Sequence, residues 1–263
     1  MIYHVLPGDS LAPEFLKTGI EGHAIICREC LAVGEVDAEN LAEFWDQRAR
    51  FIASEYGEDE VAYHETVAQE LARLLDAEMG DEVNLWFEYE FFCSVNLWFC
   101  LFLLSETEAR VFRVSPSQLK DADRWEGFGD FEATDLRKSF EQRVELTRED
   151  VEIGRDLWFA FRSHNHDKLD ELAKKNSEAF LHLAEVCEAA RERDTRPAEI
   201  VAEIMFEGKS TIEDVFPEFK QRAGVYGYGD LQVEKLIATG DSALCTADRL
   251  SLVFGFVFFG EIV

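Results

Sequence analysis

Hydrophobic and polar positions at the start of the chain predict a strand, a helix and a second strand. Residues 2–6 are an apolar run, and residues 11–16 carry apolar side chains at helical spacing. A second apolar run over residues 23–27 is followed at once by two charged residues. Strand, helix and strand within so short a stretch are typical of the opening of a parallel α/β layer.

The pattern then predicts two long helices and the most apolar part of the chain. Apolar positions three and four residues apart indicate two amphipathic helices between residues 37 and 80. A third strand is expected over residues 81–87, a helix over 91–104 and a fourth strand over 109–114. Because the helix over 91–104 is apolar all round, we expect it to be covered on every side.

Beyond residue 145 the pattern changes to helices joined by short turns. Thr147 and Asp150 predict a capped helix start, and a long amphipathic helix is expected over residues 169–193. Short helices are expected between residues 197 and 238. The aromatic segment over 243–259 predicts strands or a terminal hairpin.

These elements predict a two-domain α/β protein. Residues 1–145 are expected to form a small, mostly parallel sheet flanked by helices, with an acidic cleft at the strand ends. Residues 146–263 are expected to form a mainly helical, winged-helix-like domain with a terminal strand or hairpin.

Composition narrows the function classes. A hydrophobic content of 47% excludes a disordered chain, and a net charge of −28 argues against nucleic-acid partners, since phosphate binding relies on clustered Lys and Arg. The apolar run over residues 91–104 is shorter than the roughly 20 residues of a membrane-spanning helix. The strand-like start of the chain leaves no room for a signal peptide, so we expect a cytoplasmic protein with six free cysteines that pack as small apolar side chains.

Polar residues at the ends of three predicted strands form a candidate site. In open parallel sheets, ligands bind just beyond the carboxyl ends of the strands. Carboxylates that converge there either shift one another's pKa and act as acid and base, or hold a hard cation such as Mg²⁺ or Mn²⁺. The candidate residues are Asp9, Ser10, Arg28, Glu29, Glu88, Tyr89 and Glu90.

The four acids of this set are the expected catalytic groups, and Asp9, Glu29 and Glu88 are the expected metal ligands. The other three residues are expected to bind substrate, with Arg28 clamping a phosphate or carboxylate group. The predicted function is a metal-assisted hydrolase or transferase that acts on a small phosphate-bearing or anionic molecule.

The same residues also have structural interpretations. Asp9 is suited to cap the first helix, Arg28 and Glu88 are suited to form an ion pair, and Glu90 is suited to stand at the N-terminus of the apolar helix. The alternative function is a non-catalytic interaction or regulatory protein that binds another protein through its acidic surface and its helical C-terminal region. Whether the chain is an enzyme stays open on these grounds.

The segment YGYGDLQ over residues 226–232 is a secondary candidate. In a functional interpretation Tyr226, Asp230 and Gln232 contact a ligand or the other domain. In a structural interpretation the glycines form a tight turn and Asp230 caps the following helix, and this second interpretation is favoured.

Several motifs together resemble an uncharacterised bacterial family, domain of unknown function 1835. They are a first strand ending in GDS, a charged pair followed by LxxG, WFEYE followed by FC and NLW, and the late YGxGDLQ. The family pattern has Asp where this chain has Glu29 and Glu90, and often Gln where it has Ser94. The resemblance covers most of the chain and implies an α/β domain with a helical companion domain and a site position, but no activity.

Overall fold

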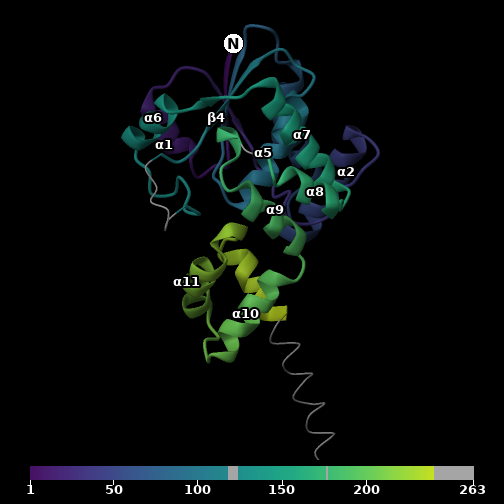
Figure 1. Ribbon diagram of the computed structural model, residues 1–263, viewed down its shortest axis with the longest axis vertical. Helices are drawn as coiled ribbons and strands as arrows, with labels where there is room; N and C mark the ends of the chain where they lie inside the picture. Colours follow the sequence, from purple (N-terminus) through teal and green to yellow (C-terminus); the bar gives the residue numbers. More distant parts are fainter. Residues whose placement is uncertain (118–123, 176, 240–263) are drawn as a thin grey trace, which may run out of the picture. The chain divides into compact units, whose positions relative to one another are not determined.

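A five-stranded sheet lies at the centre of the larger of two structural units (Figure 1). The computed structural model describes residues 1–117, 124–175 and 177–239. The chain divides into residues Met1–Arg191, which contain the sheet, and Glu192–Val263, whose described elements are helical. The predicted class, a mostly parallel sheet flanked by helices and followed by a helical region, is confirmed.

The strand order is β2-β1-β3-β4-β5, and the first four strands of that order run parallel. The four predicted strands are confirmed. The fifth was not predicted, because two residues are too short to show an alternating pattern; it pairs antiparallel with β4. The strands are β1 (Ile2–Leu6), β2 (His23–Ile26), β3 (Glu82–Trp86), β4 (Arg110–Val114) and β5 (Val144–Glu145).

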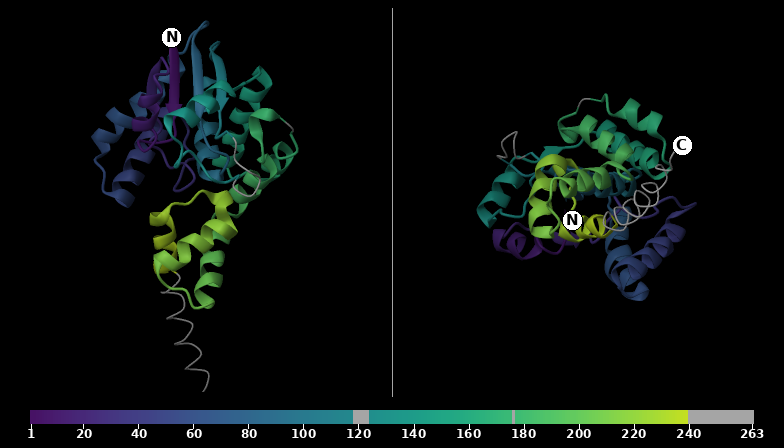
Figure 2. Two further views of the ribbon diagram at one scale, coloured as in Figure 1. Left: turned by 90° about the vertical axis from the view of Figure 1, so that its left-hand side faces the viewer. Right: turned by 90° about the horizontal axis from the view of Figure 1, so that it is seen from below.

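Helices cover both faces of the sheet (Figures 1 and 2). One face carries α1 (Ala12–Thr18) and α6 (Ala133–Glu141), which contact each other. The other face carries α2 (Leu41–Tyr56), α5 (Phe91–Leu104) and α7 (Arg148–Arg162). The opposite placement of α1 and α5 follows from right-handed crossovers that lead away from β1 and β3 in opposite directions.

The core helix α5 has the bounds that the apolar pattern predicts, and twelve of its fourteen residues are buried. Helix α7 packs directly against it. Gly154 of α7 permits this approach, since a Cβ at that position would overlap the side chain of Leu101. The sheet-containing unit therefore runs past the boundary predicted after residue 145 and ends at Arg191, because α7 is needed to cover α5.

Two predicted helices are interrupted. The second amphipathic helix before β3 is a chain of short elements: α3 (Glu60–Tyr63), a π-helical turn η1 (His64–Ala68), α4 (Gln69–Ala72) and a 3₁₀ turn η2 (Arg73–Asp76). The single helix predicted over 169–193 is wrong. That stretch contains α8 (His166–Leu172), a 3₁₀ turn η4 (Glu178–Phe180) and α9 (Leu183–Glu192), and His182 before α9 has a left-handed φ of 63°.

The second unit contains α10 (Arg196–Phe206), α11 (Ile212–Ala223), a 3₁₀ turn η5 (Gly224–Tyr226) and helical residues 230–239. The strands or hairpin predicted over 243–259 lie outside the described residues. Within the described ranges, none of the helices has the length and apolar character that crossing a membrane requires.

Candidate functional site

The sheet changes its winding direction between β1 and β3. β1 leads through α1 to β2 on one side, whereas β3 leads through α5 to β4 on the other. In open α/β sheets ligands bind beyond the carboxyl ends of the strands at such a switch point. The loops after β1 and β3 therefore occupy the expected position of a site, and they carry five of the seven candidate residues.

Asp9 and Arg28 bind each other at the surface. Nε and Nη2 of Arg28 donate to the two carboxylate oxygens of Asp9 at 2.7 and 2.8 Å, and Nη1 donates to the carbonyl of Thr66 at 3.0 Å. This guanidinium lowers the pKa of the Asp9 carboxyl. The predicted substrate clamp is therefore already occupied, and its acidic partner is Asp9 and not Glu88. The neighbouring Ser10 is exposed.

The cap predicted at Asp9 is also absent. Leu11 is the N-cap residue of α1 and makes no side-chain capping bond, while only the backbone carbonyl of Asp9 accepts a hydrogen bond, from the amide of Ala12. The carboxylate is held by Arg28, whose two donors match its two oxygens, so it does not turn toward the helix.

Glu29 forms a fully buried ion pair. Nη2 of Arg48, from α2, donates to its carboxylate at 2.9 Å, and both side chains are 0% exposed. The hydroxyl of Tyr63 donates to the same carboxylate. The pKa of that hydroxyl is raised, mainly because it is buried and next because the negative charge of Glu29 lies beside it. Arg48 also binds the carbonyl of Val33 at 2.9 Å, so the pair anchors the loop after β2. Glu29 thus has a complete set of partners that is separate from those of Asp9.

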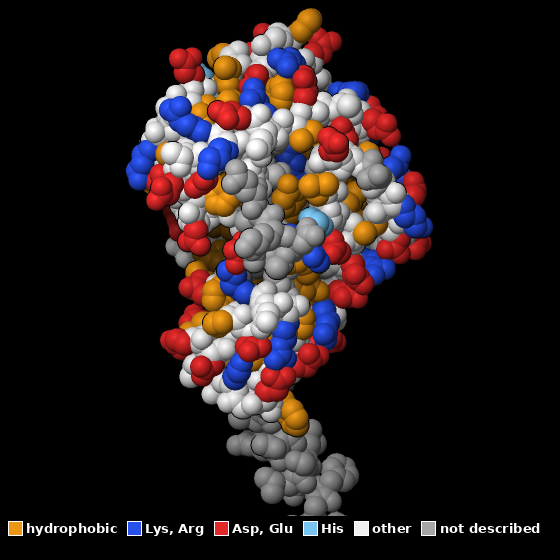
Figure 3. All heavy atoms as spheres, turned by 60° about the vertical axis from the view of Figure 1, so that its left-hand side comes forward, with side chains coloured by type: hydrophobic (Ala, Val, Ile, Leu, Met, Phe, Trp, Pro, Cys, Tyr) orange, Lys and Arg blue, Asp and Glu red, His pale blue; other side chains and the backbone are white. Residues whose placement is uncertain are grey.

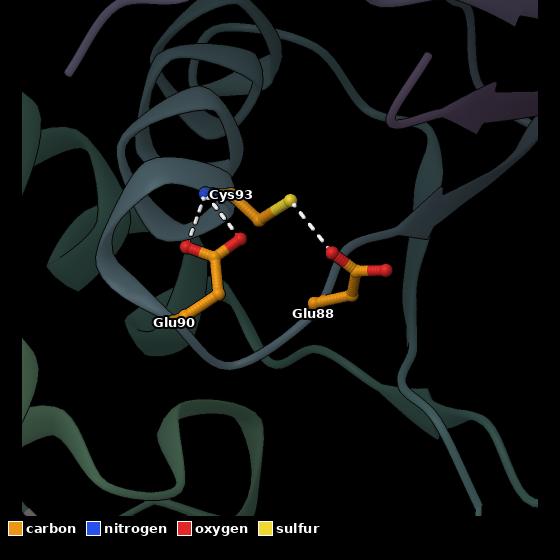
Figure 4. Close-up of side chains that lie close together, drawn as sticks. All are labelled: Glu88, Glu90 and Cys93. Carbon is orange, nitrogen blue, oxygen red and sulfur yellow. Dashed lines mark hydrogen bonds between the residues drawn. The ribbon is translucent and has the colours of Figure 1, made fainter. Parts of the chain in front are cut away.

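Glu88, Glu90 and Cys93 converge at the junction of β3 and α5 (Figure 4). A carboxylate oxygen from each glutamate and the sulfur of Cys93 all lie within 4.8 Å of one another. Glu88 is half-buried, while Glu90 and Cys93 are each 5% exposed. Among the residues that the structure describes, these three form the group of metal-ligating side chains close enough to hold one ion. The group shares only Glu88 with the ligand set predicted from the sequence.

Local capping builds this cluster. Glu90 is the N-cap of α5, and both of its oxygens accept from the backbone amide of Cys93 at 3.0 Å. The structural interpretation of Glu90 as the acid at the start of α5 is confirmed. Capping places Cys93 in the first turn, where its thiol donates to Oε2 of Glu88 at 3.3 Å.

Burial controls the protonation of the cluster. Burial first, and repulsion from Glu88 second, raises the pKa of Glu90 to about 8. The pKa of the Cys93 thiol is also raised, mainly because the thiol is buried and next because the negative charges of Glu90 and Glu88 disfavour a thiolate. At neutral pH and without a cation, Glu90 and Cys93 therefore keep their protons. A bound divalent cation reverses this preference, because it stabilises the carboxylate and the thiolate.

The turn over residues 125–130 closes against Glu88. The backbone amide of Phe128 donates to Oε1 of Glu88 at 2.7 Å. A Cβ at Gly127 would overlap the same carboxylate, so a larger residue at this position would displace the Glu88 side chain. The turn therefore fixes the direction of Glu88.

Tyr226, Asp230 and Gln232 act in local structure. Tyr226 is buried, and its ring lies 5.8 Å from that of Tyr228. Oε1 of Gln232 accepts from the amide of Gly229 at 3.0 Å, whereas Asp230 is exposed and accepts from the amide of Leu231. The predicted cap at Asp230 is wrong: the helix begins at residue 230 itself, and the bond at its start is the one from the Gly229 amide to Gln232.

Surface charge is mixed on the face shown in Figure 3. The net charge of −28 comes from 54 acidic and 26 basic residues. Figure 3 shows red and blue side chains interspersed over this face. This face therefore shows no localised acidic patch that would support the alternative, a protein partner bound through an acidic surface.

Comparison of the chain with protein-family models, with curated proteins and with solved structures finds no match in any of the three. The motif resemblance to domain of unknown function 1835 therefore stays a prediction.

Cys93 is the member of this cluster that sequence reasoning missed. A cysteine within an apolar helix has the pattern of a core residue. The available signal was its spacing, because an acid at an N-cap binds the amide three residues later and brings that side chain to the helix start.

Proposed function

We propose that the protein is a metal-dependent hydrolase or transferase whose metal ion is held by Glu88, Glu90 and Cys93. The convergence of these three ligating atoms within 4.8 Å carries the proposal. Two further observations support it: the cluster follows β3 at the switch point of the sheet, and Glu90 is buried with its pKa raised to about 8. A cation at this point would stabilise the ionised form of Glu90, which is otherwise disfavoured.

The donor set favours Zn²⁺. Thiolate ligands select softer metals, whereas Mg²⁺ prefers oxygen ligands alone. Three protein ligands leave a coordination position open for water or substrate, which is the arrangement of catalytic zinc sites. We therefore propose Zn²⁺ first and Mn²⁺ second, in place of the Mg²⁺ that a purely carboxylate site would prefer.

Such an ion would provide the chemistry of a hydrolase or transferase. Zinc lowers the pKa of bound water to about 7 and polarises a phosphoryl or carbonyl oxygen. Its charge would also attract a small anionic substrate to an otherwise acidic cluster. The substrate class proposed is a phosphate-bearing or otherwise anionic small molecule.

Isothermal titration calorimetry of the reduced protein tests the metal site. ZnCl₂, MnCl₂ and MgCl₂ are titrated into wild type, Cys93→Ser and Asp9→Asn. We expect zinc binding with one site per chain, weakened about tenfold or more in Cys93→Ser, because even indirect partners of a metal contribute that much. Asp9→Asn is the matched control: it removes an acid that Arg28 holds outside the cluster, and its zinc affinity should equal that of wild type.

Absence of zinc and manganese binding by wild type would overturn the proposal. Equal zinc affinity in wild type and Cys93→Ser would remove the thiol from the ligand set. Loss of binding in Asp9→Asn would instead restore the ligand set predicted from the strand ends.

A further inference from the structure

A buried arginine holds the segment before α9 next to the cluster by hydrogen bonds. Arg113, from β4, is 4% exposed, and burial lowers the pKa of its guanidinium to about 10. Its Nη2 donates to the carbonyl of Glu88 at 3.1 Å, and its Nη1 donates to the carbonyl of Ala179. One side chain therefore joins the end of β3 to the segment that leads into α9.

This segment presents His182 to the residue between the two glutamates. The His182 ring packs edge-on against Tyr89, with ring centroids 5.6 Å apart and an interplanar angle of 87°. The same ring also contacts that of Trp125, at a centroid distance of 5.4 Å. Three segments that are remote in sequence thus meet at the histidine, which keeps 28% of its side chain exposed.

The backbone of His182 is strained. Its φ of 63° lies in the left-handed region, which non-glycine residues occupy only at a free-energy cost. Such strain persists where the surrounding contacts hold the residue in place, and it gathers at functional sites. Here the anchor at Ala179 and the two aromatic rings supply those contacts.

The imidazole lies beside an acid, at ion-pair distance but outside hydrogen-bond geometry. Its Nδ1 lies 3.3 Å from Oε2 of Glu185, and Oε1 of Glu185 accepts from Nη2 of Arg124 at 2.8 Å. Nε2 has no hydrogen-bond partner among the residues that the structure describes. A carboxylate beside one ring nitrogen favours the tautomer that carries its proton there, and the other nitrogen is then able to accept a proton.

We propose that His182 and Glu185 form the proton-transfer dyad of the site, with Nε2 of His182 as the general base and acid. This role rests on the proposed metal-dependent function. In hydrolysis of an ester, Nε2 takes a proton from water as the water oxygen bonds to phosphorus or carbon. The bond to the leaving oxygen breaks, and that oxygen receives the proton from Nε2, so the histidine returns to its neutral form.

The variant His182→Asn tests the role with little change to the fold, because asparagine tolerates the left-handed backbone. Wild type and variant are loaded with zinc and assayed on p-nitrophenyl phosphate, bis(p-nitrophenyl) phosphate and p-nitrophenyl acetate. Zinc affinity is measured by calorimetry in parallel. We expect kcat to fall about 100-fold or more, within the usual contribution of general acid–base catalysis, at unchanged zinc affinity.

His64→Asn is the matched control, since Nε2 of His64 also lies 3.3 Å from an acid, Asp46, at the surface. It should keep the wild-type rate. Nitrogen-15 NMR of the histidine rings supplies a readout independent of activity: His182 should carry its proton on Nδ1, and Glu185→Gln should reduce that preference.

Each outcome bears on one of the two assignments. An active His182→Asn enzyme, loss of its zinc affinity, or a proton on Nε2 of His182 in wild type would overturn the dyad while leaving the metal site standing. Zinc-loaded wild type that hydrolyses none of the three esters would overturn the proposed hydrolytic function, and the proton-transfer role with it.

Discussion

Glu29 and Glu90 are both buried acids near strand ends of one sheet, yet they differ in their partners. Glu29 faces a guanidinium at 2.9 Å and the hydroxyl of Tyr63. Glu90 is held by the amide of Cys93, and within the described part of the chain it forms no ion pair. The pair at Glu29 is complete and structural. Burial favours the protonated form of Glu90, a preference that a bound cation would reverse, and this difference separates scaffold from candidate site.

Removing the cation from Glu29 should have the largest effect. Arg48→Met leaves a carboxylate buried without its partner, and breaking such a pair costs about 3–5 kcal/mol of the free energy of unfolding. Urea unfolding followed by circular dichroism measures this loss. The double variant Arg48→Met with Glu29→Gln should recover part of it. A loss under about 1 kcal/mol would mean that the two acids do not differ as described.

Glu90, in contrast to Glu29, should make the free energy of unfolding of the metal-free protein depend on pH. Its pKa of about 8 lies above that of a glutamate in the unfolded chain, so the folded state binds the proton more tightly. The resulting stabilisation is present below a pH of about 4.5 and is lost as the pH rises to about 8, by on the order of a few kcal/mol.

Urea midpoints in EDTA between pH 5 and pH 8 test this linkage. The control is Glu90→Gln, which cannot ionise and should lose less stability over the same range. Parallel curves for wild type and Glu90→Gln would show that Glu90 does not carry the dependence. Saturating zinc should flatten the wild-type curve, since the ion stabilises the ionised ligands.

Displacing the Glu88 side chain should weaken zinc binding, with a smaller effect on stability than the two changes above. Gly127→Ala introduces a Cβ that overlaps the Glu88 carboxylate, the movable end of a side chain, so we expect Glu88 to turn away at little cost in the free energy of unfolding. Zinc affinity should fall about tenfold or more as Glu88 turns away. Gly129→Ala is the matched control, because a Cβ there has no neighbour within 4 Å. Equal zinc affinity in the two variants would exclude Glu88 as a ligand.

The exposed pair of Asp9 and Arg28 should matter least. Arg28→Met removes a surface ion pair, which is typically worth less than about 1 kcal/mol. The expected shift in the urea midpoint is therefore small beside that of Arg48→Met. A comparable loss in both variants would mean that burial does not distinguish the two pairs.

Sequence reasoning placed strand ends correctly but did not predict how their acids would be partnered. Asp9, Glu29 and Glu88 follow three neighbouring parallel strands, yet their side chains bind separate partners. Arg48 reaches Glu29 from α2, and no local pattern marks a helical arginine as the partner of an acid nineteen residues earlier. His182 was missed because residues 169–193 have the apolar spacing of one helix, which its left-handed backbone interrupts.

The sequence by itself determined the four parallel strands, the core helix and the junction at Glu88 to Glu90, because periodicity and capping depend on residues a few positions apart. Only the tertiary structure decided which buried acid meets a cation. Ion pairs and ligand clusters depend on separations of about 3–5 Å between side chains from distant segments. Those separations are set by packing, so the same strand-end pattern yields a neutralised scaffold at Glu29 and a cluster open to a metal at Glu90.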